Sequence, residues 1–149
     1  MKTVISACTL LILLGIAAAA SADINSPAGL WKTIDDKTGK ERSFVRISDN
    51  NGVFEGRVEK IFDQPDDDPA HLCKACEGER KDKPIIGMNI LWGLKKDGDQ
   101  YGGGEILDPK NGKIYRAKMK LIDAGRKLEV RGFIGISLFG RSQTWLREE

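Results

Sequence analysis

The feature that most constrains this fold is a series of short runs in which apolar and polar residues alternate. In residues 113–122, one set of alternate positions is apolar and the other is basic. The apolar set is Tyr115, Ala117, Met119 and Leu121, and the basic set is Arg116, Lys118 and Lys120. Because successive side chains of a β-strand point to opposite faces, the run predicts a strand with one wet face.

Similar runs recur along the chain and are separated by turn sequences such as Asp49-Asn50-Asn51-Gly52 and Asn111-Gly112. They cover residues 30–34, 43–48, 53–62, 86–94, 101–107, 113–122, 127–133 and 141–147. No window after Ala22 has a helical period. We therefore expect an all-β fold, an eight-stranded antiparallel up-and-down barrel, because closure removes exposed edges. Charged outward faces argue against an outer-membrane barrel.

The N-terminal segment predicts export. Lys2 precedes an apolar stretch over residues 4–20, which ends in the small-residue pattern Ala20-Ser21-Ala22. This is the arrangement of a signal peptide, and the small-residue end argues against a retained membrane anchor. We expect residues 1–22 to be the signal peptide and residues 23–149 to be a single barrel domain without a membrane span, located in the periplasm or secreted.

The charge balance does not call for a polyanionic partner. The chain has 24 basic and 22 acidic side chains, so nothing in its net charge favours a polyanion. The basic row Arg116, Lys118 and Lys120 is more typical of a solvated strand face than of a phosphate-binding surface. No nucleic-acid partner is expected.

The first strand resembles the opening of a known superfamily. Gly29-Leu30-Trp31 is similar to the Gly-x-Trp signature of the calycins, which include the lipocalins and the fatty-acid-binding proteins. In lipocalins, the tryptophan closes the barrel base and packs against an arginine at the end of the last strand. The resemblance makes Arg147 the candidate partner of Trp31, with Arg141 in reserve. Such a contact is worth about 1 kcal/mol.

A wider set of stretches resembles an uncharacterised bacterial family of secreted proteins, catalogued only as a domain of unknown function. The stretches are residues 26–34, 87–94, 103–109 and 128–135, together with the Cys-x-x-Cys segment 73–78. The resemblance covers almost all of the chain after residue 22. It implies a lipocalin-like barrel in the cell envelope, and it implies no ligand, because a fold does not determine a function.

Cys73 and Cys76 lie in a polar stretch over residues 63–84, and three interpretations are open. In an exported protein a disulfide is expected, and this short ring would contribute about 2 kcal/mol. A redox-active pair would require the first cysteine at a helix N-terminus, whereas Glu77 would oppose a thiolate. A metal site would combine both cysteines with His71 and one of Asp66, Asp67, Asp68 or Glu77, which is a poor match to structural zinc. We expect the disulfide and no metal.

Catalytic motifs are scarce. His71 is the single histidine, and no Gly-x-Ser-x-Gly sequence is present to carry a nucleophile. Gly102-Gly103-Gly104 is not followed by the lysine-serine pair of a phosphate-binding loop. We therefore expect neither an enzyme nor a bound cofactor.

The alternation also predicts which side chains face the barrel interior and form a ligand-binding site. These residues are Phe54, Val58, Ile90, Trp92, Tyr115, Met119, Val130, Gln143 and Trp145, with Tyr115 and Gln143 as polar groups. Large side chains can fill an eight-stranded barrel or line a cavity with a few polar groups at its mouth. The resemblance favours the cavity.

Three functions follow from these alternatives. The first is a periplasmic or secreted binding protein for a small apolar or amphipathic ligand. The second is an envelope protein–protein interaction module with a filled barrel and the stretch 63–84 as its contact surface. The third is a thiol-disulfide oxidoreductase acting through Cys73 and Cys76.

Overall fold

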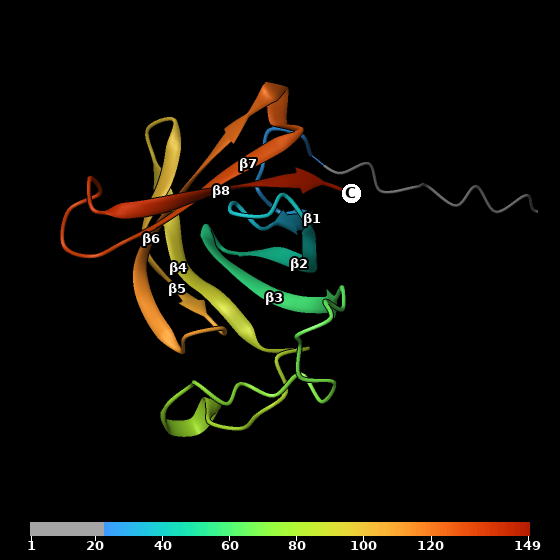
Figure 1. The fold of residues 1–149 in the computed structure, drawn as a ribbon. Coiled ribbons are helices and arrows are strands. Elements are labelled where there is room, and N and C mark those ends of the chain that lie inside the picture. The colour runs from blue at the N-terminus through green and yellow to red at the C-terminus, as the bar shows by residue number, and fades with distance from the viewer. Residues whose placement is uncertain (1–22) are drawn as a thin grey trace, which may run out of the picture.

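The computed structural model describes residues 23–149, so the predicted signal peptide, residues 1–22, lies outside the described residues. The described chain forms eight strands and two short 3-10 helices (Figure 1). The strands are β1 (Gly29–Ile34), β2 (Glu41–Asn50), β3 (Val53–Ile61), β4 (Asn89–Asp97), β5 (Gln100–Asp108), β6 (Lys113–Ile122), β7 (Lys127–Phe133) and β8 (Gly140–Arg147). The 3-10 helices are η1 (Gly78–Arg80) and η2 (Asp123–Gly125). Within residues 23–149, no helix is long and apolar enough to cross a membrane.

Each strand pairs antiparallel with the next, and β8 pairs back onto β1 to close the barrel. The predicted all-β, eight-stranded antiparallel barrel is therefore confirmed. The strand expected over 86–94 begins at Asn89 instead. Before it, Gly87 has a φ of +88° and the Met88 N–H donates to the Ile85 carbonyl, which forms a turn.

The alternate positions of the sequence are buried and exposed in turn in the structure. In β6, Ala117 and Met119 are buried while Arg116 and Lys120 are exposed. The same rule makes most of the interior apolar. The core cluster includes Trp31, Val45, Ile47, Phe54, Leu91, Leu94, Tyr101, Met119 and Leu128.

One end of the barrel, which we call the base, is closed around Trp31. The indole is fully buried, and its N–H donates to the Pro27 carbonyl at 2.8 Å. The guanidinium of Arg147 lies 4.3 Å from the centre of the Trp31 ring. Arg141 is directed elsewhere and forms an ion pair with Asp36 at 2.5 Å. Arg147, not Arg141, therefore provides the cation over this tryptophan.

Arg147 also joins three parts of the chain at the base. Its guanidinium donates to the carbonyls of Ser26 at 2.7 Å, Ala28 at 3.2 Å and Gly125 at 2.7 Å. Burial lowers the pKa of this guanidinium below its usual value, although the nearby Asp23 acts in the opposite direction. The carbonyl partners compensate for the water that the charged group loses.

Gly29 is required where the two ends of the chain meet. Its φ is +143°, and a Cβ there would lie 2.4 Å from the Glu149 carbonyl oxygen. Any larger residue would push β1 away from the C-terminal segment.

Replacing Trp31 with alanine should lower the free energy of unfolding by about 3–5 kcal/mol, because a large buried ring is lost from the closing contact. Trp92→Ala is the matched control, because Trp92 is half-exposed on the outer face of β4, and it should cost clearly less than Trp31→Ala, since only part of its ring is buried. Urea unfolding followed by circular dichroism measures both values. Equal losses in the two variants would contradict the assignment of Trp31 as the closing residue.

Candidate functional site

The opposite end of the barrel contains a cavity of about 590 Å³. Its lining comes from the β1–β2, β5–β6 and β7–β8 connections and from the segment 63–84, which all lie at the end of an up-and-down barrel remote from the base. The apolar wall includes Val58, Ile61, Ile85, Ile90, Ile106, Val130, Phe133 and Trp145. We call this end the mouth.

The interior is filled on the base side only. Phe54 and Tyr101 pack edge-to-face with ring centres 5.0 Å apart, and Met119 is buried beside the same core. Phe54 and Met119 therefore lie inside the barrel but do not line the cavity. Among the predicted ligand-binding residues, the cavity is lined by Val58, Ile90, Tyr115, Val130, Gln143 and Trp145.

Trp92 does not face the interior, contrary to the prediction from alternation. Its indole N–H donates to the Glu105 carboxylate at 3.0 Å, and the Arg80 guanidinium lies 4.8 Å from its ring. Gly93 has a φ of +73°, and this irregularity shifts the alternation so that Leu91 and Leu94 are buried. A glycine inside a strand is the sequence signal for such a bulge.

The inner wall of the cavity carries the polar side chains Thr33, Ser43 and Gln143, which are hydrogen-bonded, whereas the charged lining residues lie at the mouth. Gln143 accepts a hydrogen bond from the Trp145 indole N–H at 3.1 Å, and the hydroxyls of Thr33 and Ser43 are 2.7 Å apart. At the mouth, the Tyr115 hydroxyl accepts from the Asn111 amide at 3.0 Å. The inner cavity therefore presents mainly apolar surface, and free polar capacity is concentrated at the mouth.

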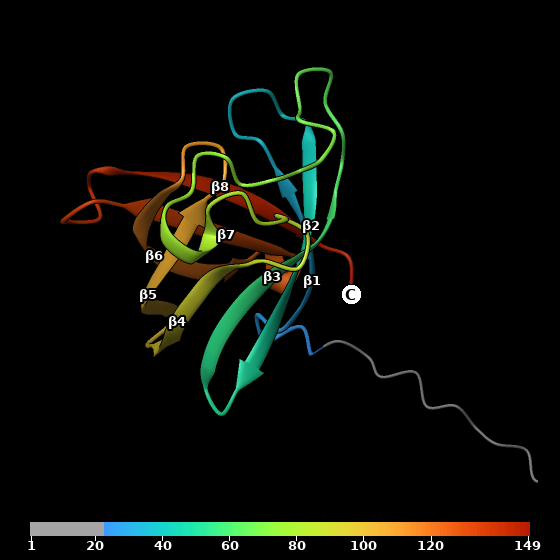
Figure 2. The same cartoon turned by 90° about the horizontal axis from the view of Figure 1, so that it is seen from below.

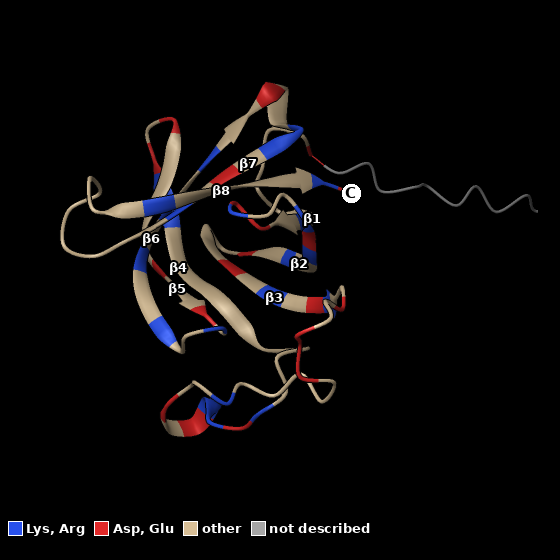
Figure 3. Ribbon diagram, viewed as in Figure 1, with Lys and Arg blue, Asp and Glu red and all other residues tan. Residues whose placement is uncertain are grey.

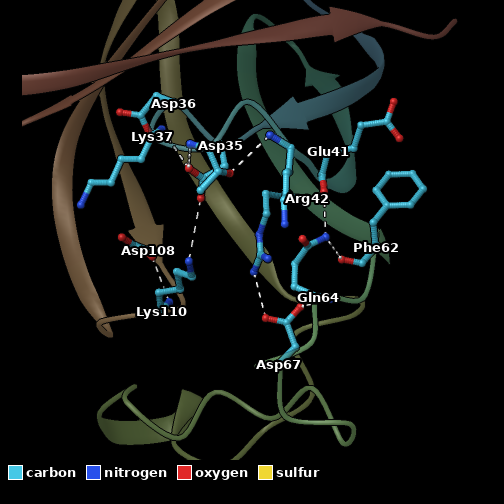
Figure 4. Close-up of polar contacts among 12 residues, drawn as sticks. Asp35, Asp36, Lys37, Glu41, Arg42, Phe62, Gln64, Asp67, Asp108 and Lys110 are labelled. Carbon is cyan, nitrogen blue, oxygen red and sulfur yellow. Dashed lines mark hydrogen bonds and ion pairs between the residues drawn. The ribbon is translucent and has the colours of Figure 1, made fainter.

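Charged residues surround the mouth in pairs (Figure 4). Arg42 and Asp67 are 3.2 Å apart, and the Lys110 ammonium lies 3.8 Å from Asp35. These pairs connect the β1–β2 hairpin to the β5–β6 hairpin and to the segment 63–84. Sequence reasoning missed them, because each pair joins connections whose paths are unknown before folding.

Among the carboxylates that line the mouth, those of Asp35 and Asp67 have pKa values below the usual range. For Asp35, the main cause is the backbone N–H of Thr38, which donates to the carboxylate at 3.0 Å. For Asp67, partial burial raises the pKa, but the Gln64 backbone N–H and the Arg42 guanidinium together outweigh it. Both groups are therefore ionised at neutral pH.

The family can be identified with the barrel and its cavity in view. Residues 29–147 match a family described as an uncharacterized protein conserved in bacteria, DUF2147. The chain belongs to this family. The matched range contains the closing pair Trp31 and Arg147 and the whole lining of the cavity.

This DUF2147 chain also resembles a solved structure. Protein HP1028 from the human pathogen Helicobacter pylori, described as belonging to the lipocalin family, aligns with a TM-score of 0.68 and 23% sequence identity. The alignment covers 82% of each chain. The DUF2147 chain therefore has a lipocalin-like barrel. No curated protein matches it.

The segment 63–84 of this DUF2147 barrel lies across the mouth (Figure 2). It contains the Cys73–Cys76 disulfide, and both cysteines are buried. The Cys73 N–H donates to the Lys83 carbonyl at 2.8 Å, which fixes the two limbs of the segment together. A Cβ on Gly112 would lie within 1.8 Å of the Ala75 carbonyl oxygen, so the segment packs directly on the β5–β6 hairpin.

The burial of the disulfide argues for a structural role. A redox pair must expose one sulfur to its substrate, whereas both Cys73 and Cys76 of this segment are buried. Neither cysteine begins a helix, since η1 starts only at Gly78. His71 pairs with Asp63 at 2.8 Å, and within residues 23–149 no group of three or more His, Cys, Asp or Glu side chains could hold a metal ion.

Replacing both cysteines with alanine should lower the free energy of unfolding by about 2 kcal/mol, the chain-entropy contribution of so short a ring. The variant should retain the barrel and any ligand binding, because the sulfurs do not line the cavity. Urea unfolding of the oxidised parent and the variant measures the difference. A variant that is as stable as the parent but has lost a thiol-exchange activity of the parent would contradict the structural role of the disulfide.

Proposed function

We propose that this protein is an exported binding protein that holds one small apolar or amphipathic molecule in its barrel. The observation that carries the proposal is the cavity of about 590 Å³ with its apolar wall. Sites for small molecules have volumes of about 300–1,000 Å³, with mostly apolar walls and a few convergent polar groups.

The distribution of side-chain sizes supports a hollow mouth. Near the base, aromatic and large aliphatic side chains meet across the barrel. Toward the mouth, the valines Val58 and Val130 stand among larger lining residues such as Ile106 and Trp145. Valine at these two inward positions leaves space that larger residues would fill.

The charges of the mouth favour an amphipathic ligand. An apolar chain or ring would occupy the wall formed by Ile90, Val130 and Trp145, because burial of apolar surface is favourable by about 25 cal/mol per Å². Its polar end would reach Arg42 and Lys110, whose present partners are carboxylates at 3.2 Å and 3.8 Å. An anionic group there would pair with Arg42 or Lys110, and the displaced carboxylate would keep the backbone N–H donor that it already has, Thr38 for Asp35 or Gln64 for Asp67.

The proposed location is the periplasm or the exterior of the cell. Lys2, the apolar stretch 4–20 and the pattern Ala20-Ser21-Ala22 support it as a signal peptide. The disulfide between Cys73 and Cys76 agrees with an oxidising compartment. The lipocalin family to which HP1028 is assigned supports ligand binding by analogy of fold alone.

The test is a titration with the apolar fluorescent probe N-phenyl-1-naphthylamine. The parent chain should bind it saturably, and Val130→Phe should weaken binding at least about tenfold, because the ring occupies cavity volume. Thr144→Phe is the matched control, since it enlarges an exposed residue on β8, and its affinity should equal that of the parent.

Urea unfolding of the Val130→Phe variant checks that it folds, and the added volume should cost about 1–3 kcal/mol. Absence of saturable binding by the parent, or equal affinity in parent and Val130→Phe, would contradict ligand binding in the barrel.

A further inference from the structure

The loop between β7 and β8 exposes an unusual amount of apolar surface. Ile134, Ile136, Leu138 and Phe139 have exposed fractions of 67%, 57%, 80% and 71%. The loop projects from the ends of the two strands (Figure 1) and contains no charged residue (Figure 3). Contiguous exposed apolar residues mark surfaces that contact a partner or a membrane.

Basic side chains support this loop from the outer faces of β6 and β7. Arg116 donates to the Gly135 carbonyl at 3.2 Å, Lys118 to the Ser137 hydroxyl at 3.1 Å, and Arg131 to the Ser137 carbonyl at 2.7 Å. Over residues 23–149, none of these three cations forms an ion pair with a carboxylate. The surface beside the apolar loop therefore carries three basic groups that no carboxylate of the described residues pairs with, although Glu105 lies opposite Arg116 on the neighbouring strand.

The same loop forms part of the cavity mouth. Ile134 and Phe139 line the cavity, as does Arg141 on β8. Apolar surface is thus continuous from the outside of the loop to the interior of the barrel. Any surface that contacts this loop would therefore lie directly beside the mouth of the cavity.

We propose that the β7–β8 loop is a docking site for a membrane surface containing anionic phospholipids. Ile136 and Leu138 insert into the interfacial region, while Arg116, Lys118 and Arg131 lie against lipid phosphates. Apolar insertion combined with basic residues is the usual basis of peripheral membrane binding. The mouth then opens at the lipid surface, where an apolar or amphipathic ligand can enter without crossing water. Membrane docking goes beyond ligand binding and is measured independently of it.

The experiment uses the chain from Asp23, because the barrel closes within Gly29–Arg147 and residues 1–22 would themselves bind lipid. Binding is measured by co-sedimentation with vesicles of equal amounts of phosphatidylethanolamine and phosphatidylglycerol, and with phosphatidylcholine vesicles. The parent should bind the anionic vesicles, bind phosphatidylcholine weakly, and lose affinity as sodium chloride is raised.

Two variants separate the contributions. Ile136→Ser/Leu138→Ser should lose affinity for anionic vesicles by at least about tenfold, since the apolar insertion is lost. Arg116→Gln/Lys118→Gln should lose about 30-fold at low salt, which corresponds to the usual effect of two basic residues near an anionic surface. Lys95→Gln/Lys96→Gln is the matched control, because it removes two exposed charges of β4 near the opposite end of the barrel and should bind as the parent does.

Absence of binding by the parent, or equal losses in the Lys95/Lys96 control, would overturn the proposal. Analytical ultracentrifugation gives a second test. A dimer that Ile136→Ser/Leu138→Ser abolishes, with no change in lipid binding, would also overturn the proposal, since the loop would then contact a second copy. Binding of N-phenyl-1-naphthylamine by Ile136→Ser/Leu138→Ser should match the parent, because neither residue lines the cavity. Failure of docking is therefore distinguishable from failure of ligand binding.

Discussion

The contact of Arg147 with Trp31 is the constraint on which the rest of the structure depends. The β1–β8 seam pairs Trp31 with Arg147 and Lys32 with Leu146 and is extended by backbone hydrogen bonds between Leu30 and residues 148 and 149, whereas the β7–β8 ladder runs from Lys127 to Phe133. A sheet that does not close leaves two exposed edges. The guanidinium compensates for the short seam, because it covers the indole and binds the carbonyls of Ser26, Ala28 and Gly125. Without it, the short seam would lose the contact that joins the end of β8 to the segment before β1 and to the β6–β7 connection.

The closed base allows the other end of the barrel to remain hollow. Aromatic packing of Phe54 on Tyr101 and the burial of Trp31 concentrate the stabilising contacts on the base side. The mouth is stabilised instead by polar contacts. Ion pairs join the β1–β2 hairpin to the β5–β6 hairpin and to the segment 63–84, and that segment, which contains the disulfide, packs on the β5–β6 hairpin. Apolar packing thus provides stability at one end, and polar contacts hold the shape of the entrance at the other. This division suits a protein that must stay folded with its cavity empty or occupied.

Much of the fold could be predicted from the sequence, and the site only in part. Alternation and turn sequences define strands and inward faces, because the two-residue period is a property of the backbone. The bulge at Gly93 broke that period, and so Trp92 lies outside rather than inside. Alternation gives the face of a strand on which a residue lies, but not its position along the barrel axis. Phe54 and Val58 therefore look equivalent in the sequence, whereas in the structure Phe54 packs in the core and Val58 lines the cavity. The pair Arg42–Asp67 depends on the path of a long connection, which no local pattern determines.

The central claim, that the hollow mouth holds a small molecule, is tested most directly by native mass spectrometry. The protein would be purified gently from its own host, and Val130→Phe would be purified in parallel. The account predicts that the parent carries a bound species of roughly a few hundred daltons, which suits a cavity of this class, and that Val130→Phe does not. A parent that has the bare protein mass, even after incubation with a lipid extract of the host, would contradict the account.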